Sequence, residues 1–342
     1  MSRLFAYVRE CYTTATDSWN EFWFAPARPL PLAWIRILTA ISLLYAHAVW
    51  TVDWRGFFGS PGWLSPQARQ VILGPQIAPY YWSHFDWIDS PAALWLIHLA
   101  GFVVLIGLLI GYQTRACAVL AWLLQVSYAH RNPLANFGLD AVHGMLAMYL
   151  MVGPSGAAWS VDEWMRQRSK DKRGNFDHGN KQSTPPPRKV GWWQSVRGLE
   201  APPSSGARLA TRLIQCHMCL IYLFSALGKI QGQTWWQGTA IWGAVGNLEY
   251  QAWDATWLAN YPLLGNFVTH LTVVWELAYC VLIWPRLWRP VMLFLAVGLH
   301  VGIGLWLGML TFGLAMLIGN LAFVLPEWWE PENEPISPTS PL

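Results

Sequence analysis

The sequence predicts an all-α, polytopic integral membrane protein built as a bundle of about eight transmembrane helices. The 342 residues are 54% hydrophobic and only 12% charged, whereas soluble domains average about 25% charged residues. Several uncharged runs are long enough to cross a bilayer. Two of the loops between these runs are rich in tryptophan, which favours the headgroup depth of a membrane. We therefore expect two Trp-rich interfacial outer loops and membrane lipid as a partner.

Residues 1–29 are expected to form an interfacial N-terminal helix. The stretch 3–24 mixes aromatic side chains with charges of both signs, a pattern typical of a helix that lies on the membrane surface. Because it lacks one apolar core, no cleavable signal peptide is expected. The prolines that follow end this helix.

Residues 30–159 form the first half of the predicted bundle. Apolar runs favour spans at about 32–50, 92–112, 114–130 and 139–152. The pattern Gly107-x-x-x-Gly111 in the second run permits close helix packing. Residues 51–90 are too polar and too rich in Pro and Gly to cross a membrane, so they form the first outer loop.

The stretch 160–207 interrupts the apolar pattern with many Lys and Arg residues and two Pro-rich segments. We expect a basic, largely unstructured cytoplasmic linker. Because these basic residues lie in a loop and not on a folded face, no nucleic-acid partner is expected.

Residues 208–326 form the second half, with spans at about 207–231 and 264–284 and an outer loop at 232–263. The run 291–325 has 35 residues without a charge, and one helix of that length measures about 52 Å against a hydrocarbon core of about 30 Å. This run is predicted to form two short spans that turn near 308–311, or one span followed by a re-entrant segment. Residues 327–342 are expected to be an acidic, disordered tail.

The basic residues predict the orientation. With eight spans, the linker and the other basic loops lie on one side, which the positive-inside rule makes cytoplasmic; Arg131 is the exception. The chain is thus expected to be multi-pass in the cell membrane with both termini cytoplasmic. Each half has one span, a Trp-rich outer loop and three spans, so an internal repeat is possible.

The stretch LIQCHMCLIYLFSALGKIQGQTWWQG at 213–238 is the strongest candidate for a site. At about 100° per residue, Tyr222, Ser225 and Lys229 share one helix face, and Trp235 and Trp236 follow as a rim. Contact with a polar ligand and an interfacial lysine whose stem lies in lipid both fit this pattern.

Several other polar residues fall in the outer half or the middle of predicted spans. A charged group in hydrocarbon costs roughly 3 kcal/mol or more, so such groups are expected to face a common polar cavity that opens outward. The supporting residues of this cavity are His47, His98, Asn136, Asp140, His143, His270 and Glu276, together with Tyr222 and Ser225. Their spacing within spans predicts no metal site.

Lys229 is expected to lie opposite Glu276 or Asp140. A lysine that acts as a base needs a neutral amine, which requires partial burial without a tight carboxylate partner. A lysine that holds helices together needs a close ion pair instead. The sequence leaves both roles open.

Two of the five cysteines, Cys216 and Cys219, form a CxxC pair one helical turn apart. The spacing permits a redox dithiol, although buried thiols usually behave as small apolar side chains. Because most cysteines lie in predicted spans, a secreted disulfide framework is not expected.

The run YLFSALGKIQGQTWWQGTAIW resembles the signature of the vitamin K-dependent γ-carboxylase family and its bacterial horizontally transferred transmembrane (HTTM) domain branch. The similarity extends over about 29–326. It includes Arg36 in the first span, the Asn136, Gly138 and Asp140 pattern, and SVDEW at 160–164. The carboxylases carry an Asn-His pair near the Asn136 pattern, where this chain has no histidine, and their large lumenal region has no counterpart before Leu342.

The resemblance implies a quinone or hydroquinone of the vitamin K type as cofactor. It also implies carboxylase or epoxidase chemistry with Lys229 as the catalytic base. Two alternatives stay open. One is a non-enzymatic membrane component that binds a lipid or peptide, and the other is a thiol–quinone oxidoreductase that uses Cys216 and Cys219.

Overall fold

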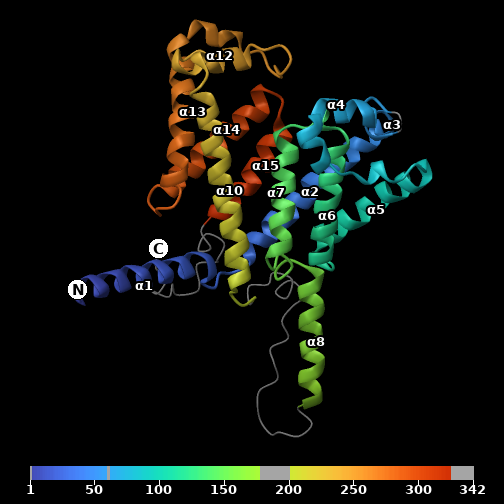
Figure 1. The fold of residues 1–342 in the computed structure, drawn as a ribbon, viewed down its shortest axis with the longest axis vertical. Helices are drawn as coiled ribbons and strands as arrows, with labels where there is room; N and C mark the ends of the chain where they lie inside the picture. The colour runs from blue at the N-terminus through green and yellow to red at the C-terminus, as the bar shows by residue number, and fades with distance from the viewer. Residues whose placement is uncertain (1, 60–61, 178–200, 325–342) are drawn as a thin grey trace. The chain divides into compact units, whose positions relative to one another are not determined.

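The computed structural model describes residues 2–59, 62–177 and 201–324, and these residues fold into fourteen α-helices joined by loops and 3-10 turns (Figure 1). The prediction of an all-α chain is confirmed. The helices, in chain order, are α1 Ser2–Phe24, α2 Leu30–Val52, α3 Trp54–Phe58, α4 Pro66–Ile77, α5 Pro91–Ile110, α6 Thr114–Arg131, α7 Gly138–Val152, α8 Val161–Asp177, α10 Ser205–Lys229, α11 Gln233–Trp236, α12 Ala240–Val245, α13 Pro262–Leu282, α14 Arg289–Trp306 and α15 Leu310–Asn320.

Among the described residues, four helices are long and apolar enough to cross a membrane, namely α2, α5, α10 and α14. The chain is therefore a multi-pass helical membrane protein. Helices α7 and α15 are apolar but have only 15 and 11 residues, which correspond to about 22 and 16 Å of helix. Both are shorter than the hydrocarbon core of about 30 Å.

Local signals set the ends of these helices. Helix α5 begins with Ser90, whose side chain accepts a hydrogen bond from the backbone N–H of Ala93, and with Pro91 in its first turn. It ends at Gly111, whose φ of 69° lies in the left-handed region that glycine tolerates best. Helix α2 likewise has Pro31 in its first turn. Capping and proline placement thus end apolar runs at bilayer length.

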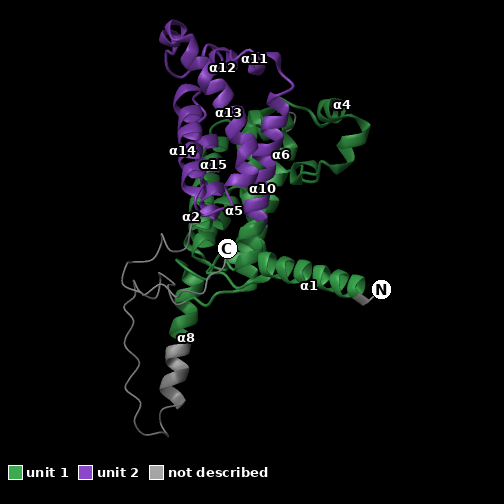
Figure 2. Ribbon diagram, turned by 90° about the vertical axis from the view of Figure 1, so that its left-hand side faces the viewer, with its two compact units in different colours: residues 1–212 green, residues 213–342 purple. Residues whose placement is uncertain are grey.

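The chain divides into two units, residues 1–212 and 213–342, with the boundary inside α10 (Figure 2). In unit 1, α2 packs against α5 and α7, and α6 packs against the same two helices. A hydrophobic cluster of Trp54, Phe58, Phe85, Leu94 and Tyr128 is buried in the same unit. Unit 1 therefore has a four-helix core, and the segment 53–90 contributes part of its buried surface.

Arg36 is completely buried in α2. Its guanidinium donates hydrogen bonds to the carbonyl oxygens of Ser155 at 2.8 Å, Ala158 at 3.4 Å and Trp159 at 2.5 Å. These carbonyls belong to the turn that follows α7, where Trp159 has a φ of 50°. Arg36 thus satisfies backbone groups that the end of a helix leaves without partners.

In unit 2, α13, α14 and α15 follow one another in space as they do in sequence. The uncharged run 291–325 is broken after α14 at Leu307, and Gly308 has a φ of 69°. The expected turn near 308–311 is confirmed. The series α2 to α7 and the series α10 to α15 both have the order of a long helix, two short helices and three further helices.

Gly313 allows α15 to lie close to α14. A Cβ atom at Gly313 would stand 2.4 Å from the carbonyl oxygen of His300, a backbone atom. We expect Gly313→Ala to lower the free energy of unfolding by about 1–3 kcal/mol, because overpacking forces the helices apart. Gly298→Ala is the matched control, since no atom lies within 4 Å of its added Cβ and alanine favours helix. Equal thermal unfolding midpoints for the two variants would contradict this prediction.

The predicted unstructured linker is corrected at its start. Residues 161–177 form α8, because Ser160 accepts a hydrogen bond from the N–H of Glu163 at 3.0 Å and acidic residues occupy the first turn. Arg166 also pairs with the Glu163 carboxylate. Residues 178–200 and the predicted tail 327–342 lie outside the described residues.

Candidate functional site

The strongest polar site of unit 2 is an ion pair between α10 and α13. Lys229 is the last residue of α10, and its Nζ lies 2.8 Å from both carboxylate oxygens of Glu276. Ser225, one turn earlier, accepts a hydrogen bond from Lys229 Nζ and donates one to Glu276 at 3.3 Å. The lysine side chain is 20% exposed and the glutamate 5%. The pair is therefore buried on the carboxylate side and open on the amine side.

Two predicted neighbours of this pair shape its open side. Nζ of Lys229 lies 5.3 Å from the ring centroid of Trp235, within cation–π range. Trp236 is 68% exposed and donates from its indole to the carbonyl of Ile230. His270 contacts the Trp236 carbonyl at 3.3 Å, so it helps to place this segment.

Tyr222 shares the helix face of Ser225 and Lys229, yet its hydroxyl has other partners. It lies 2.7 Å from Nε2 of His300 and accepts a hydrogen bond from the amide of Asn320 at 2.8 Å. Asn320 in turn accepts one from Tyr279 at 2.5 Å. His300, Asn320 and Tyr279 were not among the predicted site residues, although a His and an Asn within an otherwise apolar run are a signal of buried polar contacts.

Asp140 contacts residues of its own unit. Its carboxylate accepts hydrogen bonds from the backbone N–H of Phe137 at 3.0 Å and from Gln125 at 3.4 Å, which is the geometry of a helix N-terminal cap. Nearby, Asn136 donates to the carbonyl of Ala129 at 2.8 Å. The carboxylate paired with Lys229 is that of Glu276, so one of the two expected pairings is present.

The remaining predicted histidines of unit 1 are buried. His47 and His98 stack with ring centroids 4.1 Å apart, and His143 lies 2.7 Å from the hydroxyl of Ser42. Thr51 donates its hydroxyl proton to the carbonyl oxygen of His47 at 3.0 Å. The Thr51 oxygen can then only accept from Nε2 of His98, so Nε2 carries the hydrogen. Nδ1 of the same ring accepts a hydrogen bond from the hydroxyl of Tyr128 at 2.7 Å. These hydrogen bonds hold the rings between helices.

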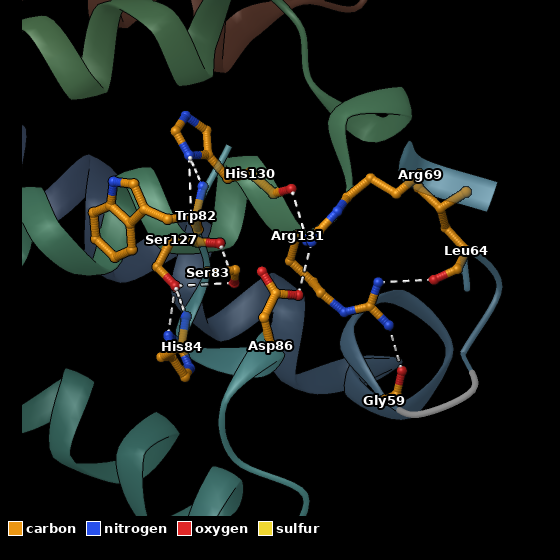
Figure 3. A network of polar contacts seen from close by, with 10 residues as sticks. All are labelled: Gly59, Leu64, Arg69, Trp82, Ser83, His84, Asp86, Ser127, His130 and Arg131. Carbon is orange, nitrogen blue, oxygen red and sulfur yellow. Dashed lines mark hydrogen bonds and ion pairs between the residues drawn. The ribbon is translucent and has the colours of Figure 1, made fainter. Parts of the chain in front are cut away.

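A polar network connects the loop 59–86 of unit 1 to the end of α6 (Figure 3). Arg131 donates to the carbonyls of Leu64 and Gly59, both at 2.7 Å, and Arg69 pairs with Asp86 at 2.8 Å. Arg131 was the exception to the charge rule, and it serves here as a buried donor to loop carbonyls. The other side chains of the network are Ser83, His84, Ser127 and His130.

His84 makes this loop sensitive to acid. Burial lowers the pKa of His84 from 6.5 to about 4. Between these two values the unfolded chain binds a proton at His84 that the folded chain does not. The free energy of unfolding therefore falls as the pH decreases from 6.5 towards 4. We expect a lower thermal unfolding midpoint at pH 5 than at pH 7. His84→Phe keeps the ring beside Phe85 and should weaken this pH dependence. The same dependence in both chains would contradict the assignment to His84.

None of the five cysteines forms a disulfide bond among the described residues. Cys219 is buried, Cys216 is partly buried, and the thiol of Cys280 donates to the carbonyl of Cys219 at 3.1 Å. The described residues contain no cluster of three or more His, Cys, Asp or Glu side chains that would hold a metal ion.

Comparisons with protein-family models, with curated proteins and with solved structures returned no match.

Proposed function

We propose that the protein binds a hydroquinone-type ligand at the Lys229–Glu276 pair and moves a proton there, as the resemblance to the vitamin K-dependent carboxylase family implies. The observation that carries this proposal is the asymmetry of the pair. The ammonium is accessible at 20% exposure, and the carboxylate behind it is buried at 5%. A polar ligand therefore meets the cation first and has a proton acceptor directly behind it.

The close pairing changes which residue acts as the base. Lys229 Nζ donates hydrogen bonds to both carboxylate oxygens of Glu276, and an ammonium has no free electron pair with which to accept a proton. Glu276 has one, because an ionised carboxylate only accepts hydrogen bonds and can take up a proton as a general base. In this proposal Glu276 takes the proton of a ligand hydroxyl, and Lys229 stabilises the oxygen anion that remains.

The surroundings of the pair suit a ligand with a flat apolar ring. Trp235 stands over the ammonium and Trp236 is exposed beside it. Aromatic rings favour stacking with other rings, and tryptophan favours the membrane–water interface. A hydroquinone fits this set of residues in polarity, with hydroxyls for the pair and a ring for the tryptophans.

Menadiol, a methylated naphthohydroquinone, provides a direct test. Its binding to the purified protein in detergent would be measured anaerobically by equilibrium dialysis for the parent, Glu276→Gln and the control Asp254→Asn, an exposed carboxylate of the same unit. We expect Glu276→Gln to weaken binding at least about tenfold, equivalent to about 1.4 kcal/mol, and Asp254→Asn to leave it unchanged. No binding by the parent, or equal binding by all three, would overturn the proposal.

The close ion pair also supports the non-enzymatic alternative, because it is the geometry expected of a lysine that holds two helices together. In that case the protein binds a lipid or peptide, and the pair contributes only stability. Menadiol binding that is insensitive to Glu276→Gln, together with stable capture of phospholipid or peptide, would favour this alternative. Loss of binding on replacing Cys216 and Cys219 by Ala would favour the thiol–quinone alternative instead.

The orientation belongs to the same proposal. We infer eight membrane crossings with α8 cytoplasmic and the loop 232–263 outside. Cysteines introduced at Ser169 and Glu249, both exposed, should then differ in labelling by an impermeant thiol reagent in intact cells. We expect labelling at 249 above the parent level and none at 169. The reverse pattern would invert the orientation.

A further inference from the structure

A second polar layer lies one helical turn from the Lys229–Glu276 pair. Tyr222 precedes Ser225 by three residues on α10, and Tyr279 follows Glu276 by three residues on α13. Three residues of helix rise by about 5 Å. The rings of Tyr222 and Tyr279 contact each other with centroids 4.3 Å apart. The same two helices therefore hold two polar layers, one above the other.

This second layer joins four helices in a fully buried position. It consists of Tyr222, Tyr279, His300 and Asn320, none of which is more than 4% exposed. Tyr222 is its centre, with hydrogen bonds to His300 at 2.7 Å and Asn320 at 2.8 Å. Tyr279 reaches the layer through the side-chain oxygen of Asn320.

The hydrogen bonds give the layer a direction. The amide nitrogen of Asn320 donates to the Tyr222 oxygen and to the carbonyl of Met316, so Tyr222 gives its own proton to Nε2 of His300. Nε2 is then the acceptor of the imidazole, and Nδ1 carries the hydrogen. Nδ1 is buried without a hydrogen-bond partner among the described residues. An unpaired buried donor costs about 1–3 kcal/mol, so the layer is not arranged for stability alone.

We propose that His300 is the proton acceptor at the end of a relay that starts at Glu276 and passes through Tyr222. This inference rests on the proposed function of the Lys229–Glu276 pair. Glu276 takes a proton from the ligand hydroxyl, and Lys229 pairs with the resulting oxygen anion. Glu276 then gives a proton to the Tyr222 oxygen while the original Tyr222 proton moves to Nε2 of His300. The net change is one O–H bond broken on the ligand and one N–H bond formed on His300.

Lys229 controls the first link of this relay. Among the described residues no hydrogen bond joins Glu276 to Tyr222, because Lys229 and Ser225 occupy the Glu276 carboxylate. Once Lys229 pairs with the ligand anion, the protonated carboxyl loses its ionic partner and is free to rotate towards Tyr222. The relay therefore operates only when a ligand is bound. In the final state His300 is positively charged and Glu276 is negatively charged again, so the two charges in the neighbouring layers have opposite signs.

Infrared difference spectroscopy of protein labelled with 15N-histidine detects this step as formation of an imidazolium. We expect menadiol to produce the imidazolium signal in the parent protein under anaerobic conditions. His300→Gln should abolish the signal, and Tyr222→Phe should abolish it while His300 remains present. Tyr279→Phe is the matched control, because it removes one hydrogen bond from the same layer but is not on the path, and it should keep the signal.

The outcomes separate this inference from the proposed function. If menadiol binds and depends on Glu276 but no imidazolium forms, the relay is wrong and the binding site stands. Equal signals in the parent and Tyr222→Phe would also overturn the relay. If menadiol does not bind to a folded parent, the proposed function fails first. Should Tyr222→Phe not fold, the signal in His300→Gln decides, since its persistence there would assign the imidazolium to another histidine.

Discussion

Replacing Lys229 with Met is expected to lower the free energy of unfolding by about 3 kcal/mol. The change leaves the Glu276 carboxylate, which is 5% exposed, without its cation. Removing one member of a buried pair costs about 3–5 kcal/mol because the other charge is left uncompensated. The lower end of this range is expected for Lys229→Met, because the Lys229 side chain is 20% exposed and water reaches it. The thermal unfolding midpoint in detergent measures the effect.

A second substitution isolates the cause. Glu276→Gln in the Lys229→Met chain removes the stranded charge, so most of the lost stability should return. Lys229→Arg retains the positive charge and should lose less stability than Lys229→Met. If Lys229→Met has the stability of the parent protein, the ion pair contributes little to folding. A neutral Lys229 base would then become the better account of this residue.

Arg36→Met is expected to cost more, roughly 3–5 kcal/mol, and to act on unit 1. The substitution preserves a long apolar side chain but removes the donors that serve the carbonyls of Ser155, Ala158 and Trp159. Each buried carbonyl left without a donor costs about 1–3 kcal/mol, and the 3.4 Å contact to Ala158 contributes least. Hydrogen exchange of the amides at 153–160 should rise together with the fall in the unfolding midpoint.

Arg115→Met is the matched control for that experiment. Arg115 lies near the start of α6 and is exposed, so a surface substitution there should change stability by no more than about 0.5 kcal/mol. Similar losses in the Arg36 and Arg115 variants would mean that loss of positive charge, and not loss of carbonyl partners, explains the effect.

The helices were largely predictable because their signals are local. The run 92–112 is apolar apart from His98, so hydropathy alone predicts both ends of α5 to within two residues. Helix α8 was missed for a related reason. Its basic composition resembles that of a linker, and the local signal that favours a helix there is the capping pair Ser160 and Glu163.

The candidate site was predictable only in part. Lys229, Ser225 and Tyr222 share a face because helix periodicity is set by sequence spacing alone. The layer partners His300 and Asn320 lie 78 and 98 positions from Tyr222, and no local pattern connects them. Polar side chains in apolar helices identify candidates, but not which of them meet.

The sequence by itself determined that this is a helical membrane protein, because hydropathy acts over one helix length and needs no knowledge of the packing. It also placed Lys229 at the end of a helix beside tryptophans. Only the tertiary structure decided that Glu276, 47 positions away, is a carboxylate paired with Lys229. That pairing depends on which helices pack together and in what register. The sequence alone therefore allows Lys229 to be either a neutral base or one partner of an ion pair.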